Sequence, residues 1–112
     1  MGDAAPMHPL RGLLVPLVKL ALDGGSPAAS GWRQDAARAH DAMAGWTPGA
    51  DDLARDWPAA VALAERDPAV RTDETVNPTL PRISPVTLAA LSAQHPDWDI
   101  IVAAIRDNAS FG

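Results

Sequence analysis

Residues 9–22 read PLRGLLVPLVKLAL, which is far more apolar than a surface helix of so small a protein needs to be. Only Arg11 and Lys19 bring charge to it. On a helical projection one broad apolar face is formed by Leu10, Leu13, Leu14, Leu17, Val18 and Ala21. Val15, Leu20 and Leu22 extend the apolar surface around the helix beyond this face. A helix that is apolar almost all round lies at the centre of its domain or against a partner. The sequence leaves both alternatives open.

The chain has 112 residues, which suits a single domain that buries a modest core. It is rich in alanine, a residue that favours helix but buries little area. We expect one helical domain over residues 1–112. Within it, residues 1–8 form a flexible N-terminus and residues 67–84 a long connection that contains several prolines.

The charge balance argues against nucleic acid as a partner. Nine Lys and Arg face fourteen Asp and Glu, for a net charge of −5, whereas phosphate binding depends on clustered basic residues. Residues 85–107 have a helix-turn-helix outline, yet Asp97 and Asp99 stand at the end that would approach DNA. No stretch reaches the ~20 apolar residues needed to span a bilayer. We therefore expect a cytoplasmic protein that contacts neither nucleic acid nor membrane.

Proline marks where helices begin and end. The chain has eleven prolines, and several follow a residue suited to cap a helix and precede an apolar or alanine-rich run. Besides 9–22, the sequence predicts helices over 30–44, from Thr47 to a break or bend at Pro58, from there to Arg66, from Ser84-Pro85 to about 93, and over 97–107. Pro16 is expected to kink the first helix, and Asp23-Gly24-Gly25 to end it with a left-handed cap.

The last of these helices has the clearest pattern. Trp98, Ile101, Val102 and Ile105 stand at i, i+3, i+4 and i+7, which is one face of an α-helix. Strand-like alternation is absent from the sequence. The predicted fold is therefore all-α, a single compact irregular bundle of five to six short helices.

The connection over 67–84 lacks a sustained period. Pro68, Pro78 and Pro81 interrupt it. A connection of this length without structure of its own is usually functional, tied down or mobile. We expect Val76, Leu80 and Ile83 to pin it to the helices.

The residues that carry most enzyme chemistry do not gather in this sequence. His8, His40 and His95 form no i, i+4 pair, and the run from His95 to Asp99 is typical of a capped helix start. Ser84 and Thr47 precede prolines and are expected to cap helices rather than act as nucleophiles. The sequence has no cysteine. We expect no catalytic residue, no metal and no cofactor.

The four tryptophans stand out beside an absence of tyrosine and a single phenylalanine. They are Trp32, Trp46, Trp57 and Trp98. An alanine-rich core needs bulky residues to fill it, which accounts for most of them. The alternative is that some line a ligand site.

These observations favour a small acidic, non-catalytic subunit that binds another protein or itself, such as an adaptor, an accessory subunit, or an immunity or antitoxin protein. The residues expected to bind the partner are Leu10, Leu13, Leu14, Leu17 and Trp98. The alternative from another class is a small-ligand-binding protein or enzyme that uses the tryptophans with His40 or His95.

Overall fold

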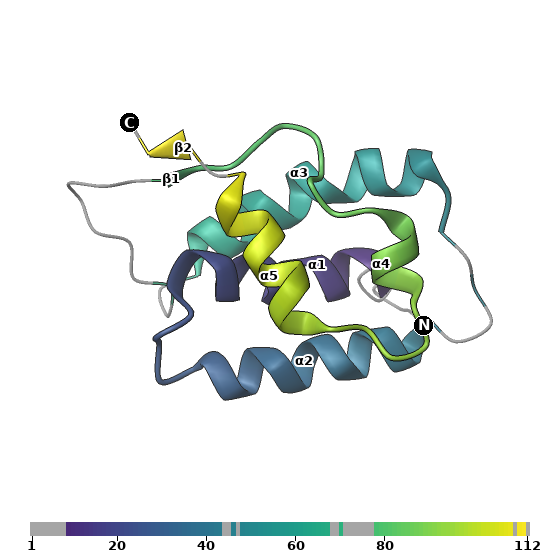
Figure 1. The fold of residues 1–112 in the computed structure, drawn as a ribbon, viewed down its shortest axis with the longest axis horizontal. Coiled ribbons are helices and arrows are strands. Elements are labelled where there is room, and N and C mark those ends of the chain that lie inside the picture. The colour runs from purple at the N-terminus through teal and green to yellow at the C-terminus, as the bar shows by residue number, and fades with distance from the viewer. Residues whose placement is uncertain are drawn as a thin grey trace, which may run out of the picture.

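The computed structural model describes residues 9–43, 46, 48–67, 70, 78–108 and 110–111. Within these ranges lie five helices: α1 (Pro9–Asp23), α2 (Ala29–Ala42), α3 (Ala50–Arg66), α4 (Leu88–Ser92) and α5 (Trp98–Asp107). The strands β1 (Pro78–Thr79) and β2 (Ser110–Phe111) form a two-residue antiparallel pair, with Pro78 opposite Phe111. The expected all-α bundle is confirmed (Figure 1).

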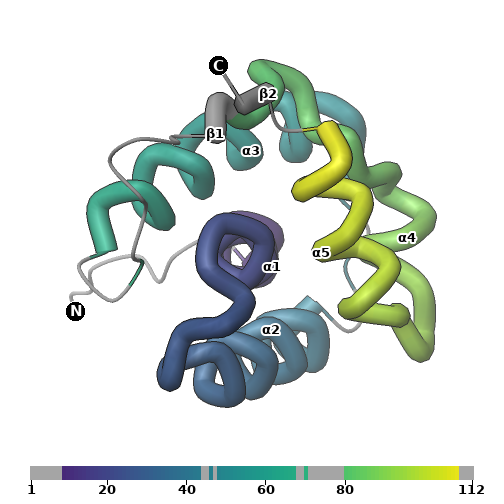
Figure 2. Tube along the Cα trace, turned by 60° about the vertical axis from the view of Figure 1, so that its left-hand side comes forward, coloured from purple at the N-terminus to yellow at the C-terminus, as the bar shows by residue number. Residues whose placement is uncertain are grey.

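Helix α1 is the centre of the bundle. Figure 2, which looks almost along α1, shows α2, α3 and α5 arranged around it, and all three pack against it. Six of its large apolar side chains are 0–2% exposed: Leu10, Leu13, Leu14, Leu17, Val18 and Leu20. Most of the apolar surface of this helix is thus covered by three neighbours within the same chain, while Val15, Ala21 and Leu22 are partly buried.

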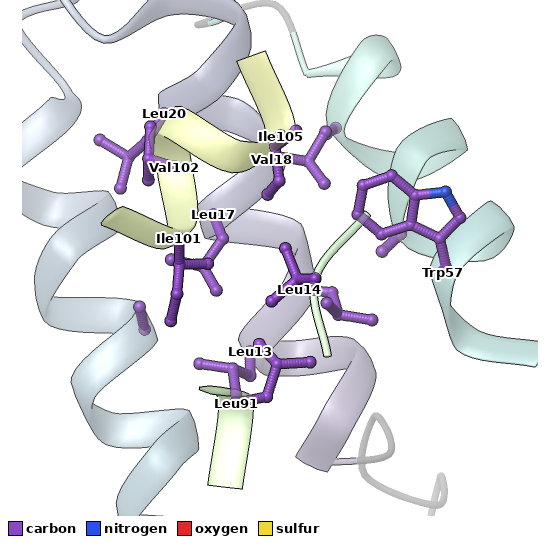
Figure 3. Close-up of a cluster of buried hydrophobic side chains, with 14 of the residues drawn as sticks. Leu13, Leu14, Leu17, Val18, Leu20, Trp57, Leu91, Ile101, Val102 and Ile105 are labelled. Carbon is purple, nitrogen blue, oxygen red and sulfur yellow. The ribbon is translucent and has the colours of Figure 1, made fainter. Parts of the chain in front are cut away.

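The helices that surround α1 each contribute one apolar face. Helix α2 buries Trp32, Ala36 and Met43. Helix α5 buries Ile101, Val102 and Ile105 of the predicted stripe, and Figure 3 shows them converging on Leu17, Val18 and Leu20 of α1. Small residues bring α1 and α2 close together, because a methyl group at Gly12 would lie 3.8 Å from the Cβ of Ala39.

Helix α3 is one continuous helix, so the break predicted at Pro58 is wrong, while the alternative of a bend stays a prediction. Proline inside a helix costs about 3 kcal/mol because it removes a backbone hydrogen bond. Trp57, Ala60 and Ala64 are fully buried in the core, and their burial offsets this cost. The carbonyl of Ala54 is the group that loses this hydrogen bond. Pro58 and Ala54 are both exposed, so water can reach this part of the helix. Helix α1 likewise continues through Pro16.

Ion pairs fix the register of α1 against α3. Arg11 Nη2 lies 3.1 Å from Asp56 Oδ1, and Lys19 Nζ lies 2.5 Å from Asp67 Oδ2. The first pair joins the early part of each helix and the second joins their ends, so α1 and α3 run parallel. The only two charged side chains within the run 9–22 therefore both bind α3 or its C-terminal cap.

Asp56 is the one polar residue in the described core, with 0% exposure. Besides Arg11, Arg55 donates to it through Nε at 3.2 Å. This hydrogen bond and the charge of Asp56 raise the pKa of Arg55, and Asp52 adds to the effect. A buried carboxylate is tolerated here because two guanidinium groups neutralise it and satisfy its oxygens.

The ends of the later helices are set by side-chain caps. Asp97 Oδ1 accepts from the backbone N–H groups of Asp99 and Ile100, at 3.1 and 3.2 Å, as the sequence predicts for α5. Helix α4 is shorter than predicted and begins at Leu88, because Thr87 and not Ser84 caps it, accepting from Ala90 N at 3.1 Å. Ser84 instead forms a local turn with Val86.

The end of α1 also differs from the prediction. Neither Gly24 nor Gly25 adopts the left-handed backbone of the expected cap. Glycine is needed at 24 for a different reason: a methyl group there would lie 2.9 Å from the Leu20 carbonyl oxygen. Close approach of the chain to the helix end therefore accounts for this residue.

We predict that Asp56→Ala lowers the free energy of unfolding by about 3 kcal/mol, since it leaves Arg11 without its buried partner. This is the lower end of the usual range, because the Arg11 side chain is still 32% exposed. Urea denaturation followed by tryptophan fluorescence measures the change. Asp51→Ala, an exposed acid on the same helix, is the control and should change stability by less than about 0.5 kcal/mol. Equal effects of the two substitutions would contradict the assignment.

Candidate functional site

The four leucines predicted to bind a partner lie inside the bundle. Leu10, Leu13, Leu14 and Leu17 are each 0% exposed. This prediction is corrected for these four leucines, because they lie in the core where α1 packs against α2, α3 and α5. Trp98, the fifth residue, is half-buried at the start of α5 and packs on His40. The structure therefore resolves the choice between a central helix and a docking helix in favour of the central helix.

The tryptophans of the alternative hypothesis and His40 pack within or against the bundle. Trp57 is fully buried and donates its Nε1–H to the Pro81 carbonyl oxygen at 2.8 Å. Trp32 is buried, and Trp46 is partly buried against the core. His40 meets Trp98 edge-on with ring centroids 5.7 Å apart, and its Nε2 lies 2.7 Å from the Ala93 carbonyl oxygen. Because a carbonyl only accepts, Nε2 carries the proton in this contact.

The other polar candidates do not come together. His95 is exposed beside the start of α5, and Ser84 is engaged in its own turn. His8 and Thr47 lie outside the described residues. Over the described ranges, no three His, Cys, Asp or Glu side chains are placed to share a metal ion.

An apolar depression lies between α3 and the segment that leads into α4. We call it the Ile83 groove; it has a volume of about 310 Å³ and is lined by Ala50, Leu53, Ala54, Ile83, Ser84 and Leu88. Ile83 is 82% exposed, the highest value among the large hydrophobic residues of the described chain. Exposing a β-branched side chain of this size to water forgoes about 1.5–3 kcal/mol of burial.

The backbone around Ile83 explains why this side chain is outside. Pro81 is held to α3 by the bond from Trp57, and Leu80 packs on the core. Val86, on the other side, is buried with 5% exposure and is fixed by its turn with Ser84. Because both flanks are anchored inward, Ile83 is left on the outer side of the segment. The prediction that Ile83 pins this segment is wrong, while the packing of Leu80 agrees with it; Val76 lies outside the described residues.

The charges around the Ile83 groove are few. Arg55 on α3 is occupied by Asp52 at 3.2 Å and by Asp56. Asp51 and Arg82 are exposed and flank the groove residues in sequence. The opening is thus apolar within and nearly neutral around its edge, which suits an uncharged side chain.

Comparison of the chain with protein-family models, with curated proteins and with solved structures finds no match. Among the described helices, none combines the length and the apolar character needed to cross a membrane.

We predict that Leu17→Asp unfolds the protein. The substitution removes a fully buried leucine, which alone costs about 2–5 kcal/mol, and places a carboxylate in the core at a further cost of several kcal/mol. Together these approach the whole stability of a domain, about 5–15 kcal/mol. Far-UV circular dichroism and urea denaturation test this. Ile83→Asp, the same chemical change at an exposed site, should keep the native spectrum; a folded Leu17→Asp variant would overturn the central role of α1.

Proposed function

We propose that this protein acts without catalysis, as a small subunit that holds a short segment of another protein in the Ile83 groove. The observation that carries the proposal is the 82% exposure of Ile83 beside Leu53 and Leu88. Large apolar residues that gather around a concavity on a small monomer mark interaction sites more often than isolated exposed residues do. The interaction hypothesis drawn from the sequence is retained, and its site moves from α1 to this groove.

The size of the groove favours a short segment as the occupant. A stable complex of two folded proteins buries about 800 Å² on each partner, spread over about 20–30 residues a side. Six small or medium residues supply far less, so a second copy of this chain would gain too little from the groove alone. A volume of about 310 Å³ instead suits one bulky apolar side chain as an anchor.

The groove and its surroundings favour an uncharged occupant. The lining is almost wholly apolar, and the nearby Arg55 is already neutralised by Asp52 and Asp56. A charged anchor would lose its hydration without gaining a counter-ion. The proposed occupant is therefore a leucine, phenylalanine or tryptophan side chain on an extended or helical peptide. A cytoplasmic location belongs to the same proposal.

Selection of random twelve-residue peptides on the purified protein tests the proposal. We expect the selected peptides to share one bulky apolar residue and to shift the backbone amide resonances of Leu53, Ile83 and Leu88 in ¹H–¹⁵N spectra. Ile83→Asp should weaken their binding at least about tenfold, equivalent to about 1.4 kcal/mol, in a fluorescence polarisation assay.

Ile100→Asp is the matched control, since Ile100 is 68% exposed but lies on α5, outside the groove. Its affinity for the selected peptides should stay within about twofold of the wild type, a difference well below 1 kcal/mol. Equal losses from the two substitutions would show non-specific apolar adhesion. Light scattering that reports a dimer abolished by Ile83→Asp would show that the occupant is a second copy instead. Either result overturns the proposal.

A further inference from the structure

The Ile83 groove has one polar feature of its own, a backbone acceptor on α3. In an α-helix each carbonyl accepts a hydrogen bond from the N–H four residues later, so the partner of the Ala54 carbonyl would be residue 58. Residue 58 is Pro58, which lies inside the helix and has no N–H. The Ala54 carbonyl oxygen therefore lacks the donor that a helix normally supplies.

The geometry of a helix brings this oxygen to the margin of the groove. Helix carbonyls point along the axis toward the C-terminal end, so the oxygen lies on the surface between Ala54 and Pro58. Both residues are exposed. Ala54 lines the groove together with Ala50 and Leu53, whereas Pro58 does not. The acceptor thus stands where the apolar lining supplied by α3 ends.

The lining of the groove has no donor to spare for this oxygen. Ser84 carries the only side-chain donor among the six lining residues, and its hydroxyl donates to the Val86 carbonyl oxygen at 2.9 Å. On α3 itself, Arg55 is engaged with Asp52 and Asp56. A ligand in the groove therefore meets a hydrogen-bond acceptor at the edge of an apolar surface.

An apolar ring with a single donor matches this arrangement. The indole N–H of tryptophan donates and brings no acceptor that would lose its hydration, whereas a tyrosine hydroxyl does. Leucine and phenylalanine have no donor, so they would cover the Ala54 carbonyl without pairing it, which is unfavourable. The chain forms the same kind of contact elsewhere on α3, where Trp57 Nε1–H donates to the Pro81 carbonyl oxygen at 2.8 Å.

We propose that the Ile83 groove selects tryptophan, whose indole ring lies against Leu53, Ile83 and Leu88 while its Nε1–H donates to the Ala54 carbonyl oxygen. This proposal rests on the function proposed above for the groove, and it names the anchor residue of the partner. Pro58 then determines specificity from outside the groove, because it leaves the acceptor unpaired within the helix. The hydrogen bond that Pro58 costs α3 is replaced by one to the partner.

Three capped tripeptides test the indole contact: acetyl-Gly-X-Gly-amide, in which X is tryptophan, phenylalanine or 3-benzothienylalanine. The last has the shape of tryptophan but carries sulfur in place of the indole N–H. In titrations followed by ¹H–¹⁵N spectra of the full chain, we expect the tryptophan peptide to bind about fivefold more tightly than the other two, equivalent to about 1 kcal/mol. The indole resonance of a ¹⁵N-labelled tryptophan peptide should move downfield on binding. Equal affinities of the tryptophan and benzothienylalanine peptides would overturn the proposal.

The substitution Pro58→Ala separates the contact from the fold. It restores a backbone N–H at residue 58, so the Ala54 carbonyl is paired within α3. We expect the affinity for the tryptophan peptide to fall about fivefold, while that for the benzothienylalanine peptide stays within about twofold. The melting temperature should not fall, since alanine is favoured over proline in a helix interior. A preference for tryptophan that persists in this variant would contradict the role of Pro58.

The substitution Ile83→Asp shows which of the two proposals has failed, if one has. It should weaken binding of all three peptides at least about tenfold. If the wild-type protein binds none of the peptides, the groove is not the site and both proposals fail. If it binds all three equally and Ile83→Asp still abolishes binding, the groove remains the site and only the selection of tryptophan fails.

Discussion

Burial of the leucines of one central helix governs how the other helices of this protein are placed. In a chain of 112 residues, three helices are needed to cover α1, and they supply most of the remaining core. Each neighbour then has only one face to bury, which fits the mixture of alanine and a few bulky residues on α2, α3 and α5. The parallel placement of α1 and α3 follows from the same constraint, because the two basic residues of α1 reach Asp56 and Asp67 only in that direction.

The helical fold was predictable because its signals are local. The stripe from Trp98 to Ile105 and the face from Trp32 to Met43 carry the 3.6-residue period, and Asp97 is a recognisable cap. The continuity of α3 through Pro58 was not predictable, because a local rule against proline was outweighed by burial of Trp57 and Ala64. Whether α1 is core or interface was also beyond local signals, since the answer depends on how many helices surround it.

The candidate site shows the same limit more sharply. Leu80 and Ile83 are similar residues in one irregular segment, and no period distinguishes them. Leu80 packs on the core whereas Ile83 is exposed to solvent. This difference depends on the hydrogen bond between Trp57 and Pro81, whose partners are 24 residues apart, and on the turn at Ser84. The ion pair between Arg33 and Asp99 spans 66 residues, and it too can be recognised only once the helices are packed. Sites made from side chains left over after packing are hidden from sequence patterns.

The central position of α1 also has a consequence for synthesis. This helix precedes α3 and α5 along the chain, yet needs both to be covered. At about 5–20 residues per second, translation leaves its leucines without their full shelter for several seconds after they emerge from the ribosome. The pairing with α2 comes early and covers only one side. During synthesis the chain therefore exposes an apolar surface that is buried in the folded protein. The yield in the cell depends on how well this surface is kept from aggregating until α3 and α5 have been made.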